Sequence, residues 1–226
     1  MSLGVVIPCF NESETISVLL TKVAEQKCVK EIIVVDDAST DDSYQKILEF
    51  RDSRIRIIRQ PKNMGKGAAL QKGFSQASTE VVIVQDADLE YDPNEYLKML
   101  LLISNGTADV VYGSRFLTSE SRRAVYFWHR VGNFVLTLFS NMWTNINLTD
   151  METCFKMMPT NIAKELKIKE TRFGVEPEIT AKLAKRKLRI YEVPISYYGR
   201  TYEEGKKITW KDGFRAIYCV VKYNLR

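Results

Sequence analysis

Acidic residues follow a short apolar run in the stretch VVIVQDADLEYD, which extends from Val81 to Asp92. Asp86, Asp88 and Glu90 occupy alternate positions there. Acids two positions apart on an extended chain project to the same side until the chain turns. Such a pair can simply be hydrated at the surface. The alternative is a divalent cation such as Mg²⁺ or Mn²⁺, because hard cations take carboxylate oxygens and keep water and substrate phosphates as further ligands.

Other reactive residues give weaker patterns. Gly65, Lys66 and Gly67 lack the G-x-x-x-x-G-K-[ST] spacing of a P-loop, although Lys66 can reach a phosphate from a helix N-terminus and the glycines can form a tight turn. The single histidine, His129, lies in an aromatic segment and gives little support to a Ser-His-Asp or Cys-His site. The cysteines lack any C-x-x-C spacing, so neither zinc nor disulfides are indicated and we expect a reducing cytosol: Cys9, Cys28, Cys154 and Cys219.

The composition allows one sizeable hydrophobic core. The chain has 226 residues, 45% of them hydrophobic, and 33 basic against 28 acidic residues give a net charge of +5. This modest excess does not resemble the basic stripe of a nucleic-acid binder and suits anionic small molecules or a membrane surface better. The N-terminus lacks a basic region and a cleavage site, so we expect no secretory signal.

The most apolar stretch is the aromatic segment from Ala124 to Trp143, AVYFWHRVGNFVLTLFSNMW. His129, Arg130 and Asn133 interrupt it, so it does not reach the ~20 apolar residues that a membrane-spanning helix needs. It can form a buried helix or one that lies at an interface. Composition alone favours the buried helix.

Strand and helix patterns alternate along the first half of the chain. We expect strands at 3–10, 31–40, 55–61 and 81–88 and helices at 13–26, 41–52 and 65–77. The second half is less regular, with expected strands at 108–116, 152–158 and 188–195, a helix at 176–186 and a basic, aromatic tail. Such repetition predicts an open α/β sheet, whose ligands bind beyond the carboxyl ends of the strands.

Seven motifs in order carry a family resemblance: VVIPCFNE, IIVVDDAST, VVIVQDADLE, VYGSRF, TDMETCFK, RFGVEPEI and YGRTYEEGKK. The series resembles the family 2 glycosyltransferases of GT-A type, and it covers nearly the whole chain. The later motifs most resemble the dolichyl- or polyprenyl-phosphate mannose and glucose synthases. The resemblance implies an α/β fold, the GT-A nucleotide-binding αβα sandwich with a mostly parallel central sheet. It also implies one GT-A domain over 1–226, with a nucleotide-sugar-binding half at 1–115 and an acceptor-binding half at 116–226.

The resemblance also implies the donor site. Asp86 and Asp88 would hold Mg²⁺ or Mn²⁺ with Glu90 as a third ligand, and Asp88 would be catalytic in this sense. Asp37 would accept hydrogen bonds from the base, whereas Asp36 can be structural. The remaining donor contacts would come from Pro8, Asn11, Glu12 and Lys66, together with a basic loop that contains Arg200, Lys206 and Lys207. That loop can instead be a solvated charge run.

On the acceptor side, the resemblance implies that Arg115 and Arg130 grip a phosphate through bidentate, charge-assisted bonds, and both are predicted catalytic residues. A salt bridge with an acid is the alternative for Arg115. A phosphate monoester has a second pKa of about 6, so it is already an anionic nucleophile at neutral pH and needs no base. The acids near the position of a base would then only orient the sugar or the arginines: Asp150, Glu152 and Glu176.

The implied reaction is inverting transfer of a hexose from UDP-glucose or GDP-mannose to a polyprenyl or dolichyl phosphate. The aromatic residues around Phe127 and Trp128 and the basic, aromatic tail at 208–226 place aromatic side chains beside lysines and arginines. We therefore expect a protein that docks peripherally at the cytoplasmic face of a membrane, directly or through a separate anchor subunit, with no nucleic-acid partner. One alternative is transfer to a glycan or protein hydroxyl, with Asp150 or Glu152 as base. A second is a nucleotide-sugar-binding module without turnover.

Overall fold

One mixed sheet runs through the computed structural model, which describes residues 1–117, 123–124, 126–172, 174–201, 203 and 210–225. Its strand order is β3-β2-β1-β4-β6-β5-β7. The neighbours pair in parallel except at β6, which is antiparallel to both β4 and β5. The predicted mostly parallel α/β sheet is confirmed. The strands are β1 Leu3–Cys9, β2 Val29–Asp36, β3 Ile55–Arg59, β4 Val81–Val84, β5 Val110–Ser114, β6 Lys156–Pro159 and β7 Ile190–Pro194.

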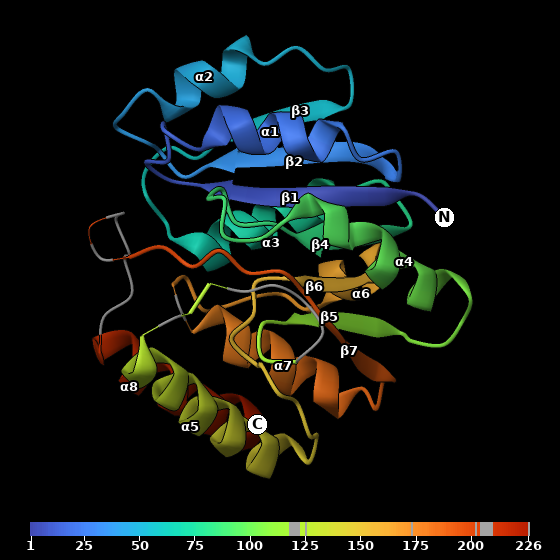
Figure 1. Cartoon of the computed structure of the whole chain (residues 1–226), viewed down its shortest axis with the longest axis vertical. Coiled ribbons are helices and arrows are strands. Elements are labelled where there is room, and N and C mark those ends of the chain that lie inside the picture. Colours follow the sequence, from blue (N-terminus) through green and yellow to red (C-terminus); the bar gives the residue numbers. More distant parts are fainter. Residues whose placement is uncertain (118–122, 125, 173, 202, 204–209, 226) are drawn as a thin grey trace.

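Helices cover both faces of this sheet (Figure 1). The helices α1 and α4 lie on one face and α3 and α6 lie on the other, while α5 and α8 pack against each other and against α7 at one end of the molecule. The sequence patterns do not predict α4, α6 or α8. The helices are α1 Ile16–Ala24, α2 Ser43–Glu49, α3 Lys66–Gln76, the 3-10 turn η1 Pro93–Glu95, α4 Tyr96–Ser104, α5 Phe127–Thr144, α6 Thr160–Glu165, α7 Val175–Lys185 and α8 Trp210–Leu225.

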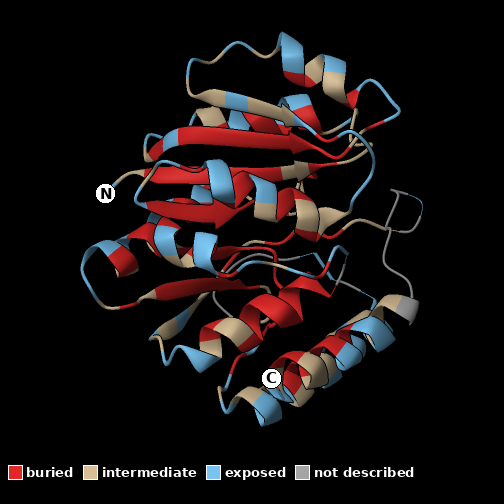
Figure 2. Ribbon diagram, turned by 180° about the vertical axis from the view of Figure 1, so that it is seen from behind, coloured by how far each residue is buried: buried red, intermediate tan, exposed pale blue. Residues whose placement is uncertain are grey.

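The central strands are apolar on both sides because helices cover both faces of the sheet. All four residues of β4 are buried, as are all but one of β1 and all but one of β2 (Figure 2). The polar residues begin where these strands end. The core therefore fixes the strand ends, and the loops beyond them carry the candidate site.

The aromatic segment is a helix, but the prediction that it is buried is wrong. Within α5 only Thr137 and Ser140 are buried, and Phe127, Trp128 and Met142 are each at least 69% exposed. Small and polar side chains allow close packing of α5 on its neighbours, while many of its large apolar side chains face outward. None of the described helices combines the length and the apolar character needed to cross a membrane.

Candidate active site

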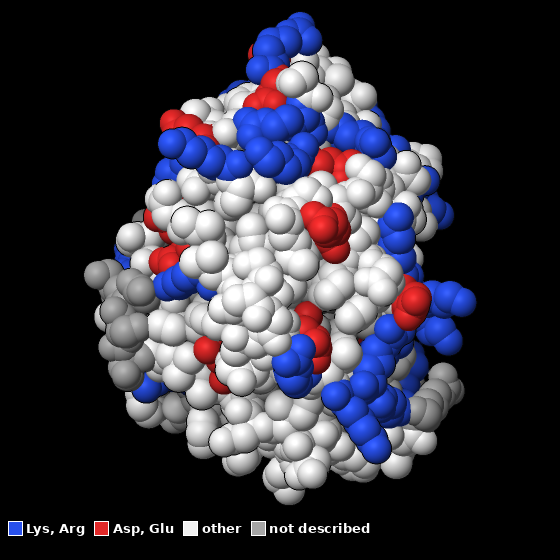
Figure 3. Space-filling view, turned by 90° about the vertical axis from the view of Figure 1, so that its right-hand side faces the viewer, with Lys and Arg blue, Asp and Glu red and all other residues white. Residues whose placement is uncertain are grey.

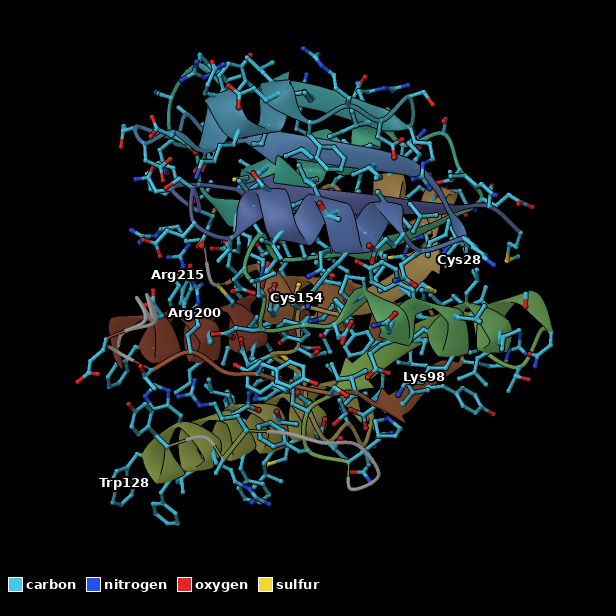
Figure 4. The ribbon with its side chains drawn as sticks, turned by 45° about the horizontal axis from the view of Figure 1, so that its top comes forward. Cys28, Lys98, Trp128, Cys154, Arg200 and Arg215 are labelled. Atoms are coloured by element: carbon cyan, nitrogen blue, oxygen red, sulfur yellow. The ribbon has the colours of Figure 1, made fainter. Side chains whose placement is uncertain are left out.

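Three acids share one arginine beyond the carboxyl ends of β1 and β4. The guanidinium of Arg200, which follows β7, donates to Glu12 at 3.1 Å and to Asp88 at 2.9 Å. Its backbone N–H donates to Oε1 of Glu90 at 2.9 Å, and the hydroxyl of Tyr197 donates to Oε2 of Glu90 at 2.6 Å. Figure 4 shows Arg200 between the sheet and the helix pair α5 and α8. We call Glu12, Asp88, Glu90 and Arg200 the acidic cluster.

The acidic cluster carries more negative than positive charge. Burial, followed by the charges of Asp86 and Glu90, raises the pKa of Asp88 to about 7, although the guanidinium of Arg200 acts in the opposite direction. One arginine therefore does not neutralise these carboxylates. The cluster attracts further positive charge.

A lysine connects Asp86, two residues before Asp88 of the acidic cluster, to α7. The ammonium group of Lys66 contacts Asp86 at 2.8 Å and Glu176 at 2.9 Å. Burial lowers the pKa of Lys66, but the charges of Asp86 and Glu176 outweigh it and hold that pKa well above its ordinary value. Lys66 begins α3 directly after Gly65, whose φ of 90° suits glycine. This turn directs Lys66 toward the strand ends.

The donor atoms here suit a divalent cation. Asp86, Asp88 and Glu90 offer carboxylate oxygens, the ligands that Mg²⁺ and Mn²⁺ prefer, and the cluster lacks positive charge. In the part of the chain that the structure describes, no three His, Cys, Asp or Glu residues are arranged as a ready metal site. The acids instead contact Arg200 and Lys66. These residues therefore fit a cation by charge and atom type, with the two basic side chains as its competitors.

The loops after β1 and β2, where we predicted nucleotide contacts, are connected by hydrogen bonds. Pro8 lies in β1, and Asn11 follows with a left-handed φ of 52°, which Asn tolerates better than most residues. Oδ1 of Asn11 accepts a hydrogen bond from the backbone N–H of Thr40 at 2.8 Å. The backbone N–H of Glu12 donates to the hydroxyl of Ser43 at 2.8 Å. Asn11 and Glu12 thus lie at a fixed place at the sheet edge.

Asp37 organises the loop that leads to Lys66. Its carboxylate accepts hydrogen bonds from the side chain of Gln60 and from the backbone N–H groups of Met64 and Gly65, each at 2.7 Å. Asp36 forms an ion pair with Arg59 at 3.2 Å. Hydrogen bonding of Asp37 to a nucleotide base stays a prediction, and such bonds would be added to these three.

Arg115, a predicted acceptor-binding residue, forms the salt bridge that was the alternative to phosphate binding. Its Nε and terminal nitrogen contact the two oxygens of Asp150 at 2.7 Å each, and its backbone N–H donates to Asp150 at 3.0 Å. Asp150 is fully buried and also accepts from Asn133 of α5 at 3.4 Å. Phosphate binding by Arg115 stays a prediction, because this pair would have to open or share its donors.

Arg130 lies on the exposed surface of α5, three residues before Asn133. Residues three apart in a helix are neighbours on its surface, so Arg130 lies one turn from the contact between Asn133 and Asp150. The structure thus places Arg130 on the helix that touches the Arg115 pair. Lys206 and Lys207 lie outside the described residues.

Sequence reasoning missed two site residues. Tyr197 binds Glu90, and the guanidinium of Arg115 lies 5.2 Å from the centre of its ring. Lys156 is 1% exposed and donates to the backbone carbonyls of Met151 and Thr153. Lys156 stands in the TDMETCFK motif and Tyr197 precedes the YGRTYEEGKK motif by one residue, so the motifs marked the region. The burial of a lysine has no sequence signal of its own.

Comparisons with known proteins show which family this sequence resembles. The profile described as Glycosyl transferase family 2 matches residues 4–167. A dolichol-phosphate mannosyltransferase from Pyrococcus furiosus is 37% identical over 120 residues, which cover 52% of this chain and only 34% of that protein. An undecaprenyl-phosphate mannosyltransferase from Micrococcus luteus is 24% identical over 209 residues, with 89% of this chain and 85% of that protein covered.

The fold also occurs in a solved enzyme structure. Glucosyl-3-phosphoglycerate synthase from Mycobacterium tuberculosis, in complex with Mn²⁺, UDP-glucose and phosphoglyceric acid, superposes with a TM-score of 0.77 at 18% identity. The match covers 99% of this chain and 79% of that one, and it shows the shared GT-A fold. Because the family profile matches most of the chain and the fold agrees, this chain belongs to glycosyl transferase family 2.

Proposed function

We propose that the protein is a metal-dependent, inverting hexosyltransferase that moves a hexose from UDP-glucose or GDP-mannose to a polyprenyl or dolichyl phosphate. Membership of glycosyl transferase family 2 supports the hexosyltransferase activity. The observation that carries the proposal is the acidic cluster, in which one arginine faces three carboxylates at the ligand-binding edge of the sheet. A cation together with an anionic diphosphate completes such a cluster.

The donor side follows from the residues at this edge. Asp86, Asp88 and Glu90 would hold Mg²⁺ or Mn²⁺, and the bound cation would neutralise the charge of the departing nucleoside diphosphate. The Mn²⁺ and UDP-glucose in the Mycobacterium tuberculosis enzyme support a metal and a nucleotide-sugar donor. Lys66 and Arg200, which now hold the acids, would turn their positive charges to the diphosphate. Pro8, Asn11, Glu12 and Asp37 would line the nucleotide side.

The names of the two mannosyltransferases support a polyprenyl-phosphate acceptor. A phosphate monoester attacks without a general base, since its second pKa of about 6 leaves it anionic at neutral pH. Asp150 is poorly suited to be a base, because Arg115 already binds both of its oxygens. Arg115 and Arg130 would bind the acceptor phosphate, and a single displacement would give a β-linked sugar phospholipid.

One observation favours the second candidate function, transfer to a glycan hydroxyl. Burial and the charge of Glu176 raise the pKa of Glu152 to about 8, close to the pH at which a general base must work. Under that function Glu152→Gln or Asp150→Asn would eliminate turnover, and the arginine variants would be mild. A binding module without turnover would show no slow hydrolysis of the donor in the presence of Mn²⁺.

The outer surface of α5 supports a peripheral position at the cytoplasmic face of a membrane, by direct contact or through an anchor subunit. Phe127 and Trp128 project from the start of α5, and Trp128 points away from the body of the protein (Figure 4). In Figure 3, the lowest part of the visible face is mostly uncharged, whereas Lys and Arg gather at the upper end and at the lower right. Exposed aromatic residues on an amphipathic helix are typical of interfacial binding.

The decisive experiment measures the KM of acceptor and donor for Arg115→Ala and Arg130→Ala. Loss of a charge-assisted bond worth roughly 1.5–3 kcal/mol should weaken acceptor use about tenfold or more and change donor KM much less. Lys at either position should recover only part of the loss. Arg51→Ala, an exposed arginine after α2, is the control and should change neither KM. Normal acceptor KM in both variants would contradict the lipid-phosphate acceptor.

Because Arg115→Ala also leaves Asp150 buried without its partner, its thermal unfolding must be measured alongside its kinetics. Arg130 is exposed and free of this complication. The donor is identified by a thermal-shift panel of UDP-glucose and GDP-mannose with and without Mn²⁺, since a ligand that binds only the folded state raises its stability. A protein that neither donor stabilises would contradict the proposed function.

A further inference from the structure

Two carboxylates beside the acidic cluster each have a buried oxygen atom without a hydrogen-bond partner. Glu152 lies in the segment before β6, and Glu176 lies in the first turn of α7. Oε1 of Glu152 and Oε2 of Glu176 are inaccessible to solvent and accept no hydrogen bond from the described residues. Glu176 as a whole is only 7% exposed. Buried acceptors are nearly always paired in folded proteins, so these two oxygens indicate a ligand that supplies the donors.

The position of Glu176 indicates which part of a ligand that is. Its Oε1 accepts from Lys66 at 2.9 Å, and Lys66 also contacts Asp86 at 2.8 Å. In the proposed function, Asp86 and Lys66 act at the donor diphosphate. The sugar of a nucleotide sugar is bonded directly to that diphosphate, so it lies within reach of the next residue along this chain of contacts.

The chemistry of the pair favours hydroxyl groups over a second cation. Ammonium groups are already present, because Lys66 contacts Glu176 and the charge of Lys156 acts on Glu152. The unpaired oxygens therefore lack hydrogen-bond donors more than they lack positive charge. Since burial and Glu176 raise the pKa of Glu152 to about 8, Glu152 is mostly protonated at neutral pH and can donate as well as accept. A hydroxyl also does both.

We propose that Glu152 and Glu176 bind hydroxyl groups of the donor hexose and thereby take part in selecting the sugar. This inference rests on the proposed function, because it requires a nucleotide-sugar donor at the pair of Asp86 and Lys66. Glu176 accepts from a sugar hydroxyl through Oε2 while its Oε1 keeps Lys66 in place. Glu152 faces the same sugar from the segment before β6.

The experiment compares two dissociation constants, one for the nucleotide sugar and one for the nucleoside diphosphate alone, in the presence of Mn²⁺. The probes are UDP-glucose with UDP and GDP-mannose with GDP, and the pair that binds the wild-type protein is used. In Glu152→Ala and in Glu176→Gln, the Kd of the nucleotide sugar should rise about tenfold relative to that of the diphosphate. The Kd of the diphosphate should change less than twofold.

Glu178→Gln is the matched control. Glu178 is a fully buried acid on the same helix, but its oxygens already accept from the backbone N–H groups of Lys169 and Glu170. Its replacement should lower the thermal midpoint and leave the ratio of the two Kd values unchanged. Thermal unfolding of all three variants shows that the protein remains folded at the temperature of the titrations.

Several outcomes would overturn the inference. An unchanged ratio would mean that water fills the site. Equal weakening of the diphosphate and of the nucleotide sugar would mean that the two acids act through Lys66 alone. A loss of kcat in Glu152→Ala with an unchanged ratio would make Glu152 a general base. Wild-type protein that binds neither nucleotide would contradict the proposed function itself, and that failure is visible before any variant is made.

Discussion

Two clusters of charged residues in this protein have opposite balances of charge. In the acidic cluster, Arg200 forms ion pairs with three carboxylates at the edge of the sheet. At the junction of α8 with the segment before α7, one carboxylate forms ion pairs with two cations. Glu170 accepts from Arg215 at 2.5 Å, from Lys222 at 2.7 Å and from the hydroxyl of Tyr223 at 2.9 Å.

The difference is the one expected between the proposed ligand site and a structural anchor. Glu170 is 4% exposed, and two cations balance its negative charge. These contacts stabilise the folded protein without any ligand. In the acidic cluster, burial and neighbouring acids raise the pKa of Asp88 to about 7. An arrangement that stays short of positive charge is costly to the folded protein and is typical of functional sites.

The largest expected effect comes from the acidic cluster. Asp88→Asn removes a proposed metal ligand, so we expect transfer to fall about a hundredfold or more, whereas the fold remains intact because repulsion with Asp86 and Glu90 decreases. Turnover with Mn²⁺ and the thermal midpoint are the two measurements. The control is Asp92→Asn, since Asp92 belongs to the same stretch but caps η1 through the backbone N–H of Asn94. Turnover near the wild-type rate in Asp88→Asn would remove the metal hypothesis.

Substitution of Glu170 in the structural anchor should have the opposite effect. The protein should lose stability and keep most of its catalytic activity. Glu170→Gln removes a buried charge from two cations, which should lower the free energy of unfolding by about 2 kcal/mol. Glu165→Gln, which breaks a more exposed pair with Arg186, should cost less than about 1 kcal/mol. Denaturant unfolding gives both values. Equal stability of the two variants would refute the distinction between anchor and surface pair.

The anchor also predicts a pH dependence. Burial acts against it, but hydrogen bonds from Lys222, Arg215 and Tyr223 lower the pKa of Glu170 to about 2, below its ordinary 4.5. A lowered carboxyl pKa gives stability that is fully present above pH 4.5 and is lost as the pH falls toward 2. Between those values the wild-type protein should lose more stability than Glu170→Gln, which thermal unfolding across this range measures.

The smallest expected effect concerns the outer surface of α5. Replacing Phe127 and Trp128 together by Ala should weaken flotation with anionic vesicles at low salt by roughly fivefold. Leu97 and Leu101 of α4 are also exposed, at 54% and 53%, and their replacement by Ala should leave flotation unchanged. Wild-type protein that stays in the soluble fraction would contradict direct docking and leave an anchor subunit as the route to the lipid.

Much of the fold followed from the sequence because buried parallel strands are continuous apolar runs. VVIV of β4 and the apolar runs of β1 and β2 are easily recognised between helical patterns. The direction of β6 could not be predicted, since strand pairing is decided by contacts distant in sequence. Hydropathy gave α5 as a helix but not its orientation, because an apolar surface that faces solvent has the same composition as one that faces a core.

The acids of the candidate site were predicted because they follow strands that end at one edge. The basic side chains that pair with these acids were harder to predict from the sequence. Arg200 lies 188 residues from Glu12 and 112 from Asp88, and only the folded chain brings them together. The salt bridge between Arg115 and Asp150 was one of two interpretations, and residue types alone could not choose between them. The unpaired oxygens of Glu152 and Glu176 depend on side-chain burial, which motifs do not record.

The reversed strand β6 has a further consequence for how such an enzyme can change. Because β6 is antiparallel to β4 and β5, its first residue, Lys156, lies at the edge where those strands end. The short segment from Asp150 to Lys156 therefore reaches the candidate site as the chain enters β6. It is separate from the loops after β1, β2 and β4. Under the proposed function, substitutions in these few residues would change the sugar or the acceptor during evolution while the loops proposed to bind the nucleotide are inherited unchanged.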